Sequence, residues 1–100
     1  RPRAGELVMA KPSKTLIALV AGADLRYANL TGARLTSADL TSADLTWSNL
    51  STTDFTNANL SNATSTGGTI FTGVIWSTTT CPDGTNSSAY SPQTCFNHGI

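Results

Sequence analysis

The sequence predicts a solenoid of short repeating turns and not a globular domain, and three observations carry this prediction. A large apolar residue recurs at every fifth position from Leu25 to Leu60. A period of five fits neither the three-and-four spacing of a helix nor the alternation of a strand. Only 39% of the 100 residues are apolar and 12% are charged. The chain is therefore either largely disordered or built on a lean, repetitive core.

Each five-residue unit joins a small residue, an Asp or Asn and a large apolar residue, generally followed by Thr or Ser, as in residues 38–45. The pattern is satisfied if the chain turns a corner every five residues and keeps the small and large side chains inside. Four such sides close one coil in twenty residues. The register continues to Ile75 with Ser65 as a polar interruption. The predicted core ladder is Leu25, Leu30, Leu35, Leu40, Leu45, Leu50, Phe55, Leu60, Ile70 and Ile75.

These A-(D/N)-L-x-x units resemble the pentapeptide-repeat proteins, clearly over residues 23–63 and in degenerate form over 18–77. The resemblance implies an all-β fold, a right-handed quadrilateral β-helix of about three coils. We accordingly expect a basic N-terminal arm or cap at 1–17, the β-helix at 18–77 and a turn-rich, irregular cap at 78–100.

Two cysteines lie in the tail, where turn residues replace the repeat. Cys81 and Cys95 are an even pair in a short segment rich in Pro and Gly, which predicts a disulfide that clasps the tail over the open end of the solenoid. Free thiols in a reducing cell are the alternative. The stretch WSTTTCPDGTN also resembles tails that follow such repeats in exported bacterial proteins. With the bridge, this favours a secreted or cell-surface bacterial protein.

Charge is distributed unevenly along the chain. All six Arg and Lys residues fall within residues 1–34, which carry a net charge of +4, whereas residues 35–100 carry four Asp and no basic residue. The basic arm either docks on an acidic partner or a neighbouring copy, or is a solvated tail. Overall neutrality argues against nucleic acid as a partner. No apolar run approaches the ~20 residues of a membrane span.

No group of residues predicts catalysis. His98 is the one histidine, and the cysteines near it are expected to be bridged. The repeat position explains the carboxylates, because it accepts Asp and Asn interchangeably. There is no phosphate-binding glycine loop and no Ser-His-Asp arrangement. We therefore expect no enzyme, no cofactor and no metal site.

The predicted function is that of a structural or interaction module. It would act by self-assembly, as a homo-oligomer or filament, or by contact with another protein through the ends or faces of the solenoid. Tyr27, Trp47, Phe71 and Trp76 are the candidate interaction surface, although packing between coils explains them equally well. Two alternatives remain: rows of Thr, Ser and Asn that bind a glycan or an ice lattice, and a spacer domain of a larger exported protein.

Overall fold

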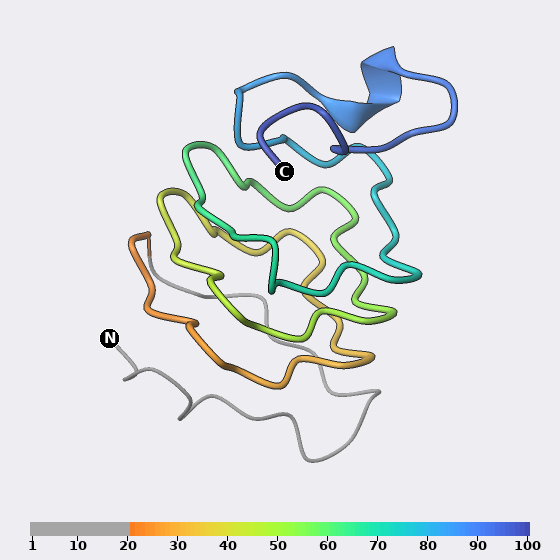
Figure 1. Ribbon diagram of the computed structural model, residues 1–100. Helices are drawn as coiled ribbons and strands as arrows, with labels where there is room; N and C mark the ends of the chain where they lie inside the picture. Colours follow the sequence, from red (N-terminus) through yellow and green to blue (C-terminus); the bar gives the residue numbers. More distant parts are fainter. Residues whose placement is uncertain (1–20) are drawn as a thin grey trace.

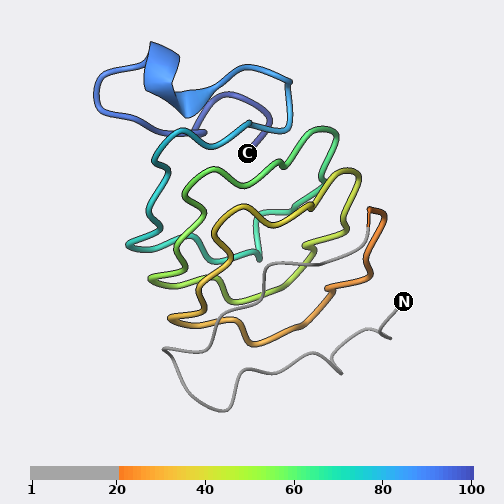
Figure 2. The same cartoon turned by 180° about the vertical axis from the view of Figure 1, so that it is seen from behind.

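The chain forms a stack of corner-linked coils with an irregular tail across one end, in a computed structural model that describes residues 21–100 (Figure 1). The same stack seen from behind shows the coils lying over one another (Figure 2). In the described part, pairing between coils consists of isolated β-bridges, and the one helix is the 3₁₀ turn η1, Ser87–Ala89. The predicted arm at 1–17, and the start of the predicted β-helix at 18–20, lie outside the described residues.

Parallel bridges arrange the coils in four columns of three layers each, which define the four sides of the solenoid. The columns are Asp24–Asp44–Thr64, Asn29–Asn49–Ile70, Arg34–Asp54–Ile75 and Asp39–Asn59–Thr80. Backbone groups of one coil bond to those of the next, as in a parallel sheet, for example Leu25 N to Asp44 O at 2.9 Å. The sequence period is thus converted into a stack in which each coil satisfies the backbone of its neighbour.

The Asp or Asn of each unit fixes the corner that follows it. Asn29 Oδ1 accepts the N–H of Thr31 at 3.2 Å and its hydroxyl at 2.8 Å. One coil further on, Asn49 Oδ1 accepts the N–H of Ser51 at 3.1 Å and its hydroxyl at 2.7 Å. Asp and Asn exchange at this position because both offer a carbonyl-type oxygen as acceptor.

The second residue of each corner has a left-handed backbone. Its φ lies between 56° and 63° in Tyr27, Ser37, Ser42, Trp47, Thr52, Asn57 and Asn62. The turn closes with a bond from the small residue to the large one, such as Ala28 N to Leu25 O at 3.1 Å. This conformation costs an ordinary residue ~1–2 kcal/mol, so Gly and Asn are the residues that local structure favours. Local structure does not account for a Tyr or a Trp at this corner.

Large side chains fill the axis of the tube. Fully buried are Leu25, Leu30, Leu35, Leu40, Leu45, Leu50, Phe55 and Leu60. Burial of each side chain stabilises the fold by about 1.5–3 kcal/mol. Where Thr replaces Ala at the small position, its hydroxyl bonds to the layer below, as Thr53 Oγ1 does to Leu30 O at 2.9 Å. Ser48 Oγ instead bonds within its own coil, to Leu45 O at 2.7 Å. Among the described residues, no buried side-chain nitrogen or oxygen lacks a partner.

The prediction that Ile70 and Ile75 lie in the core ladder is wrong, because both are outside, with 43% and 48% of their surface exposed. One extra residue enters the third coil: Asp44 pairs with Thr64, twenty residues on, but Asn49 pairs with Ile70, twenty-one residues on. The turn at this corner closes from Thr69 N to Thr66 O at 2.9 Å, one position later than the period requires.

From this corner onward, each residue occupies the place that the five-residue period assigns to the residue before it. Phe71 lies in the column of Leu50, and Trp76 takes the inward place over Phe55, with their ring centroids 5.5 Å apart. The physical reason is that the shifted register buries an indole ring, a larger apolar surface than an isoleucine offers. It also continues the coil past the predicted end at Ser77, since Thr80 still pairs with Asn59.

The tail begins after Cys81 and folds back on the last side of the third coil. Asn86 forms an antiparallel bridge with Thr80, and Ser87 N donates to Thr79 O at 2.8 Å. Figure 1 shows this tail lying across the C-terminal end of the stack. No helix in residues 21–100 has the length and apolar character needed to cross a membrane.

Candidate interaction surfaces

Two exposed aromatic side chains share one corner of the solenoid. Tyr27 is 63% exposed and Trp47 is 56% exposed. They lie in adjacent coils, since Tyr27 N donates to Thr46 O at 3.0 Å. Both have the left-handed backbone that favours small residues. Ser37, Ser42 and Thr52 have the same backbone at their corners, so the feature particular to this corner is its two exposed rings.

The Trp47 ring rests on Gly68 of the third coil. A Cβ on Gly68 would lie 2.1 Å from Cε3, 2.3 Å from Cζ3 and 2.6 Å from Cδ2 of the indole. Three neighbouring ring atoms at such similar distances place this point over the face of the ring and not beyond its rim. One face of the indole therefore covers Gly68, and the opposite face is turned away from the backbone.

A charged cluster adjoins this aromatic corner. Arg26 pairs with Asp24 through Nε–Oδ1 and Nη2–Oδ2 contacts, both 2.9 Å, and its Nε lies 3.9 Å from Asp44 Oδ2. The hydrogen bond and charge of Asp24 raise the pKa of Arg26. Partial burial opposes ionisation of Asp44, but hydrogen bonds from Thr46 and the charge of Arg26 outweigh it and lower its pKa. Arg26, Asp24 and Asp44 therefore stay ionised, and the guanidinium pairs with both carboxylates.

The third coil, at the C-terminal end of the stack, offers a second surface that is apolar and has no charged residue of its own. Ile70, Ile75 and Phe96 are each between two fifths and one half exposed, and Phe71 is partly buried beside them. Residues 55–82 contain no Asp, Glu, Lys or Arg. In the second coil, the positions of Ile70 and Ile75 are occupied by Asn49 and Asp54. In the first coil, they are occupied by Asn29 and Arg34.

The edge of the third coil is open on this side. In lower coils the large residue donates its N–H upward, as Leu50 does to Ile70 O and Phe55 to Ile75 O. The equivalent N–H groups of Phe71 and Trp76 have no acceptor in the described structure, and neither does that of Gly73. The backbone of the tail pairs with the last side, where Cys81 N donates to Thr85 O at 2.7 Å, and Ser87 Oγ donates to Trp76 O.

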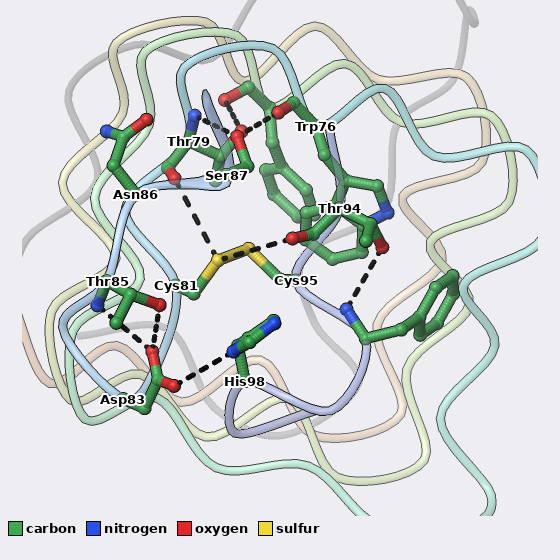
Figure 3. Close-up of a disulfide and its surroundings, with 12 residues drawn as sticks. Trp76, Thr79, Cys81, Asp83, Thr85, Asn86, Ser87, Thr94, Cys95 and His98 are labelled. Carbon is green, nitrogen blue, oxygen red and sulfur yellow. Dashed lines mark hydrogen bonds and ion pairs between the residues drawn. A yellow bond between two sulfur atoms is a disulfide. The ribbon is translucent and has the colours of Figure 1, made fainter. Parts of the chain in front are cut away.

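A disulfide between Cys81 and Cys95 holds the tail over the core (Figure 3). Both cysteines are fully buried, and their Cα atoms are 5.3 Å apart. They are 14 positions apart in the sequence. Closing a loop of this size stabilises the fold by about 3 kcal/mol in the chain-entropy account. Under the tail, Trp76 packs against Phe71 and Phe96, each with a centroid distance of 5.8 Å.

His98 links two parts of the tail. Its Nδ1 lies 3.3 Å from Asp83 Oδ2, and its ring stacks on Tyr90 at 3.8 Å. Hydrogen bonds from Thr85, chiefly from its hydroxyl, lower the pKa of Asp83. Within residues 21–100, no group of three or more His, Cys, Asp or Glu side chains is arranged to hold a metal ion. These contacts tie the tail together.

The four aromatic residues expected to form one interaction surface do not lie together. Tyr27 and Trp47 are exposed at the corner, whereas Phe71 is partly buried and Trp76 is only 5% exposed. Assigning Trp76 to the surface is wrong, because the extra residue turns its ring into the axis. The exposure of Ile70 and Ile75 was not predicted from the sequence. The doublet Gly67-Gly68, which interrupts the repeat, was the signal for the shift.

Four columns, corners at five-residue intervals and an axis filled by large side chains define a β-helical repeat solenoid. Comparison with family models matches residues 21–57 to "Pentapeptide repeats", in eight copies. Residues 21–57 are thus a run of pentapeptide repeats. Comparison with curated proteins gives no match.

A similar solved structure is HetL, a pentapeptide repeat protein involved in heterocyst differentiation regulation from the cyanobacterium Nostoc sp. strain PCC 7120. The two are 24% identical with a TM-score of 0.58, over 83% of this chain and 41% of HetL. The chain therefore spans about two fifths of the length of HetL. The likeness is one of fold, the right-handed quadrilateral β-helix.

Proposed function

We propose that the protein is a non-catalytic interaction module that associates with a second copy of itself through the C-terminal end of the solenoid. The observation that carries the proposal is the presence of Ile70 and Ile75 at outward positions of the last coil. A polar residue there would form the corner bond seen in the coils below. An exposed isoleucine forgoes that bond and adds apolar surface beside an unpaired edge.

An open β-edge is a template for pairing with another chain, and soluble proteins usually protect such edges with charge or Pro. Here the edge residues 69–76 carry neither. A second copy is the partner that this chemistry favours, because two third coils, neither with a charged residue of its own, meet without like-charge repulsion. Contact between them would bury the isoleucines and Phe96.

The test is size-exclusion chromatography with light scattering over a range of protein concentrations. We expect a discrete oligomer whose fraction rises with concentration. The double variant Ile70→Asn, Ile75→Asp places at each position the residue of the coil directly below. It should keep the fold and elute with the mass of one chain. Tyr27→Ser, a change at the remote aromatic corner, is the matched control and should still associate.

Two results would overturn this proposal. If the native chain has the mass of one chain at every concentration, self-association is not its function, and a different protein becomes the candidate partner. If the double variant associates as strongly as the native chain, the C-terminal end is not the contact surface.

We also propose that the protein acts outside the cytoplasm, where a disulfide persists. The bridge between two buried cysteines supports this location. Thiol labelling of the protein from its native source would contradict it by finding Cys81 and Cys95 reduced.

A second candidate function is adsorption to a repeating surface, such as a glycan or ice lattice. The corner bonds order the hydroxyls of Thr31 and Ser51 in one outward row. Inhibition of ice recrystallisation, lost when both residues are changed to Val, would support it. The third possibility, a spacer in a larger exported protein, requires sequence continuous with this chain.

A further inference from the structure

The aromatic corner formed by Tyr27 and Trp47 is distinct from the surface used in the proposed function. Its two rings belong to the first two described coils, and Trp47 rests on Gly68 of the third, whereas the proposed contact uses Ile70, Ile75 and Phe96. We infer that this corner is a binding site for a neutral oligosaccharide, with one pyranose ring stacked on the exposed face of Trp47.

The indole of Trp47 is held in one orientation. One face of Trp47 covers Gly68, and any side chain at residue 68 would occupy the space of the ring. The backbone at Trp47 is also fixed, because Ser48 N donates to Leu45 O at 3.0 Å and Thr46 N to Asp44 Oδ1 at 3.0 Å. A ring ordered before binding loses little conformational freedom when a ligand stacks on it.

The chain around Trp47 is also shaped to hold the ring at the surface. Trp47 has a left-handed backbone with φ of 60°. In addition, the extra residue that breaks the repeat lies at this same corner, between Ser65 and Thr69, and brings Gly68 under the ring. More than half of the Trp47 surface is still exposed. The ring is thus seated on one side and open to solvent on the other.

The charges beside the aromatic corner select the class of ligand. Asp44 disfavours an anionic polymer such as nucleic acid, since its carboxylate, about one third exposed, would face the phosphates. The Arg26 guanidinium, which is engaged with the carboxylates of Asp24 and Asp44, disfavours a cation at the same place. A neutral ligand remains, with an apolar face for the indole and hydroxyls for the surrounding polar atoms.

A β-linked hexopyranose with equatorial hydroxyls has this form. Its axial C–H groups make an apolar face that packs on an aromatic ring, and its hydroxyls lie around the rim. At this corner the phenol of Tyr27, the guanidinium of Arg26 and the carboxylate of Asp44 can exchange hydrogen bonds with them. Tyr27 lies in the next coil of the same column and extends the site along the axis.

The test is an NMR titration that follows the indole Nε1–H signals of Trp47 and Trp76. The probes are the β-1,4-linked hexamers of glucose and of N-acetylglucosamine. We expect at least one hexamer to shift the Trp47 signal in a saturable way and to leave the buried Trp76 unchanged. Trp47→Ser lacks this signal, so its dissociation constant is measured with the native one by isothermal titration calorimetry, and it should be about tenfold or more higher, the scale of one lost aromatic contact.

Gly68→Ala is the sharper variant, because it keeps the indole and removes its seat. This variant should weaken binding several-fold and leave the stacking of the coils nearly unchanged. Ile70→Asn with Ile75→Asp should bind the hexamer as the native chain does. The binding result can therefore be interpreted even if the proposed self-association fails. The inference is overturned if neither hexamer shifts the Trp47 signal, or if Trp47→Ser binds as tightly as the native chain.

Discussion

The register of the third coil predicts opposite effects for two neighbouring substitutions. Trp76 is 5% exposed and its ring packs against three others, those of Phe55, Phe71 and Phe96. Trp76→Ala should therefore lower the free energy of unfolding by about 3–5 kcal/mol. That is a large share of the ~5–15 kcal/mol typical of a small domain. Should the alanine variant fail to fold, Trp76→Phe should show a smaller loss of the same sign.

Ile75→Asp should change the free energy of unfolding by no more than about 0.5–1 kcal/mol. Nearly half of the isoleucine surface is already in water. The equivalent Asp54 accepts the N–H of Thr56 at 2.9 Å and its hydroxyl at 2.5 Å. Ser77 stands in the place of Thr56 one coil higher, so the new carboxylate has the same donors available.

Urea denaturation of the oxidised proteins, followed by far-ultraviolet circular dichroism, measures both changes on one scale. The reasoning would be refuted by the reverse result, a loss of several kcal/mol for Ile75→Asp and almost none for Trp76→Ala. That outcome would mean that the five-residue period runs unbroken through the third coil, with Ile70 and Ile75 in the axis.

Three further predictions concern the corners and the carboxylates. Asn49→Ala should lower the free energy of unfolding by about 1 kcal/mol because it removes the corner acceptor, whereas Asn49→Asp should be nearly neutral; equal losses in urea titrations would argue against the corner bond. Thr52→Asn should raise the thermal midpoint, since Asn tolerates the left-handed backbone better than a β-branched residue, and a lower midpoint would count against this. Despite partial burial of Asp44, hydrogen bonds in the fold lower the pKa of Asp39, Asp44 and Asp83. Such groups contribute stability above the ordinary Asp pKa near 4 that is lost as the pH falls through their folded values. The urea midpoint should therefore hold from about pH 8 to pH 5 and fall below about pH 4, and an unchanged midpoint at pH 3 would contradict the assignment.

The fold could be predicted from the sequence where each unit encodes its own corner. From Ala23 to Ala63 the small residue, the Asx acceptor and the large residue all specify the same turn, and the bridges follow the period of twenty. The four-sided solenoid follows from this agreement. Local chemistry and the stacking of coils give the same answer, so no long-range information is needed.

The shift at Gly67-Gly68 could not be found from the period alone. Ile70 and Ile75 satisfy the five-residue pattern, and so do Phe71 and Trp76 if one residue is inserted. The choice depends on which side chains fill the axis over Leu50 and Phe55, and this is a property of packing. Burial of an indole and closure of the disulfide at Cys81 both favour the shifted register.

The surfaces could be predicted only in part. Tyr27 and Trp47 were identified because they occupy outward positions of clear repeats. The seat of Trp47 on Gly68 was not, because it joins residues 21 positions apart across the inserted residue. The open edge depends on where the tail lies, and Pro and Gly in the tail predict turns without predicting which side of the coil they cover.

The contact of two copies through the C-terminal end is tested most directly by hydrogen exchange of single backbone amides. Phe71, Gly73 and Trp76 present N–H groups at the open edge without an acceptor, whereas the N–H groups of Leu50 and Phe55 are bonded within the stack. At high dilution the edge amides should exchange fast and the bonded ones slowly. At concentrations where the oligomer forms, the edge amides should become protected while Leu50 and Phe55 stay as they were. Edge amides that exchange equally fast in the monomer and in the oligomer would contradict the assignment of this end as the contact surface.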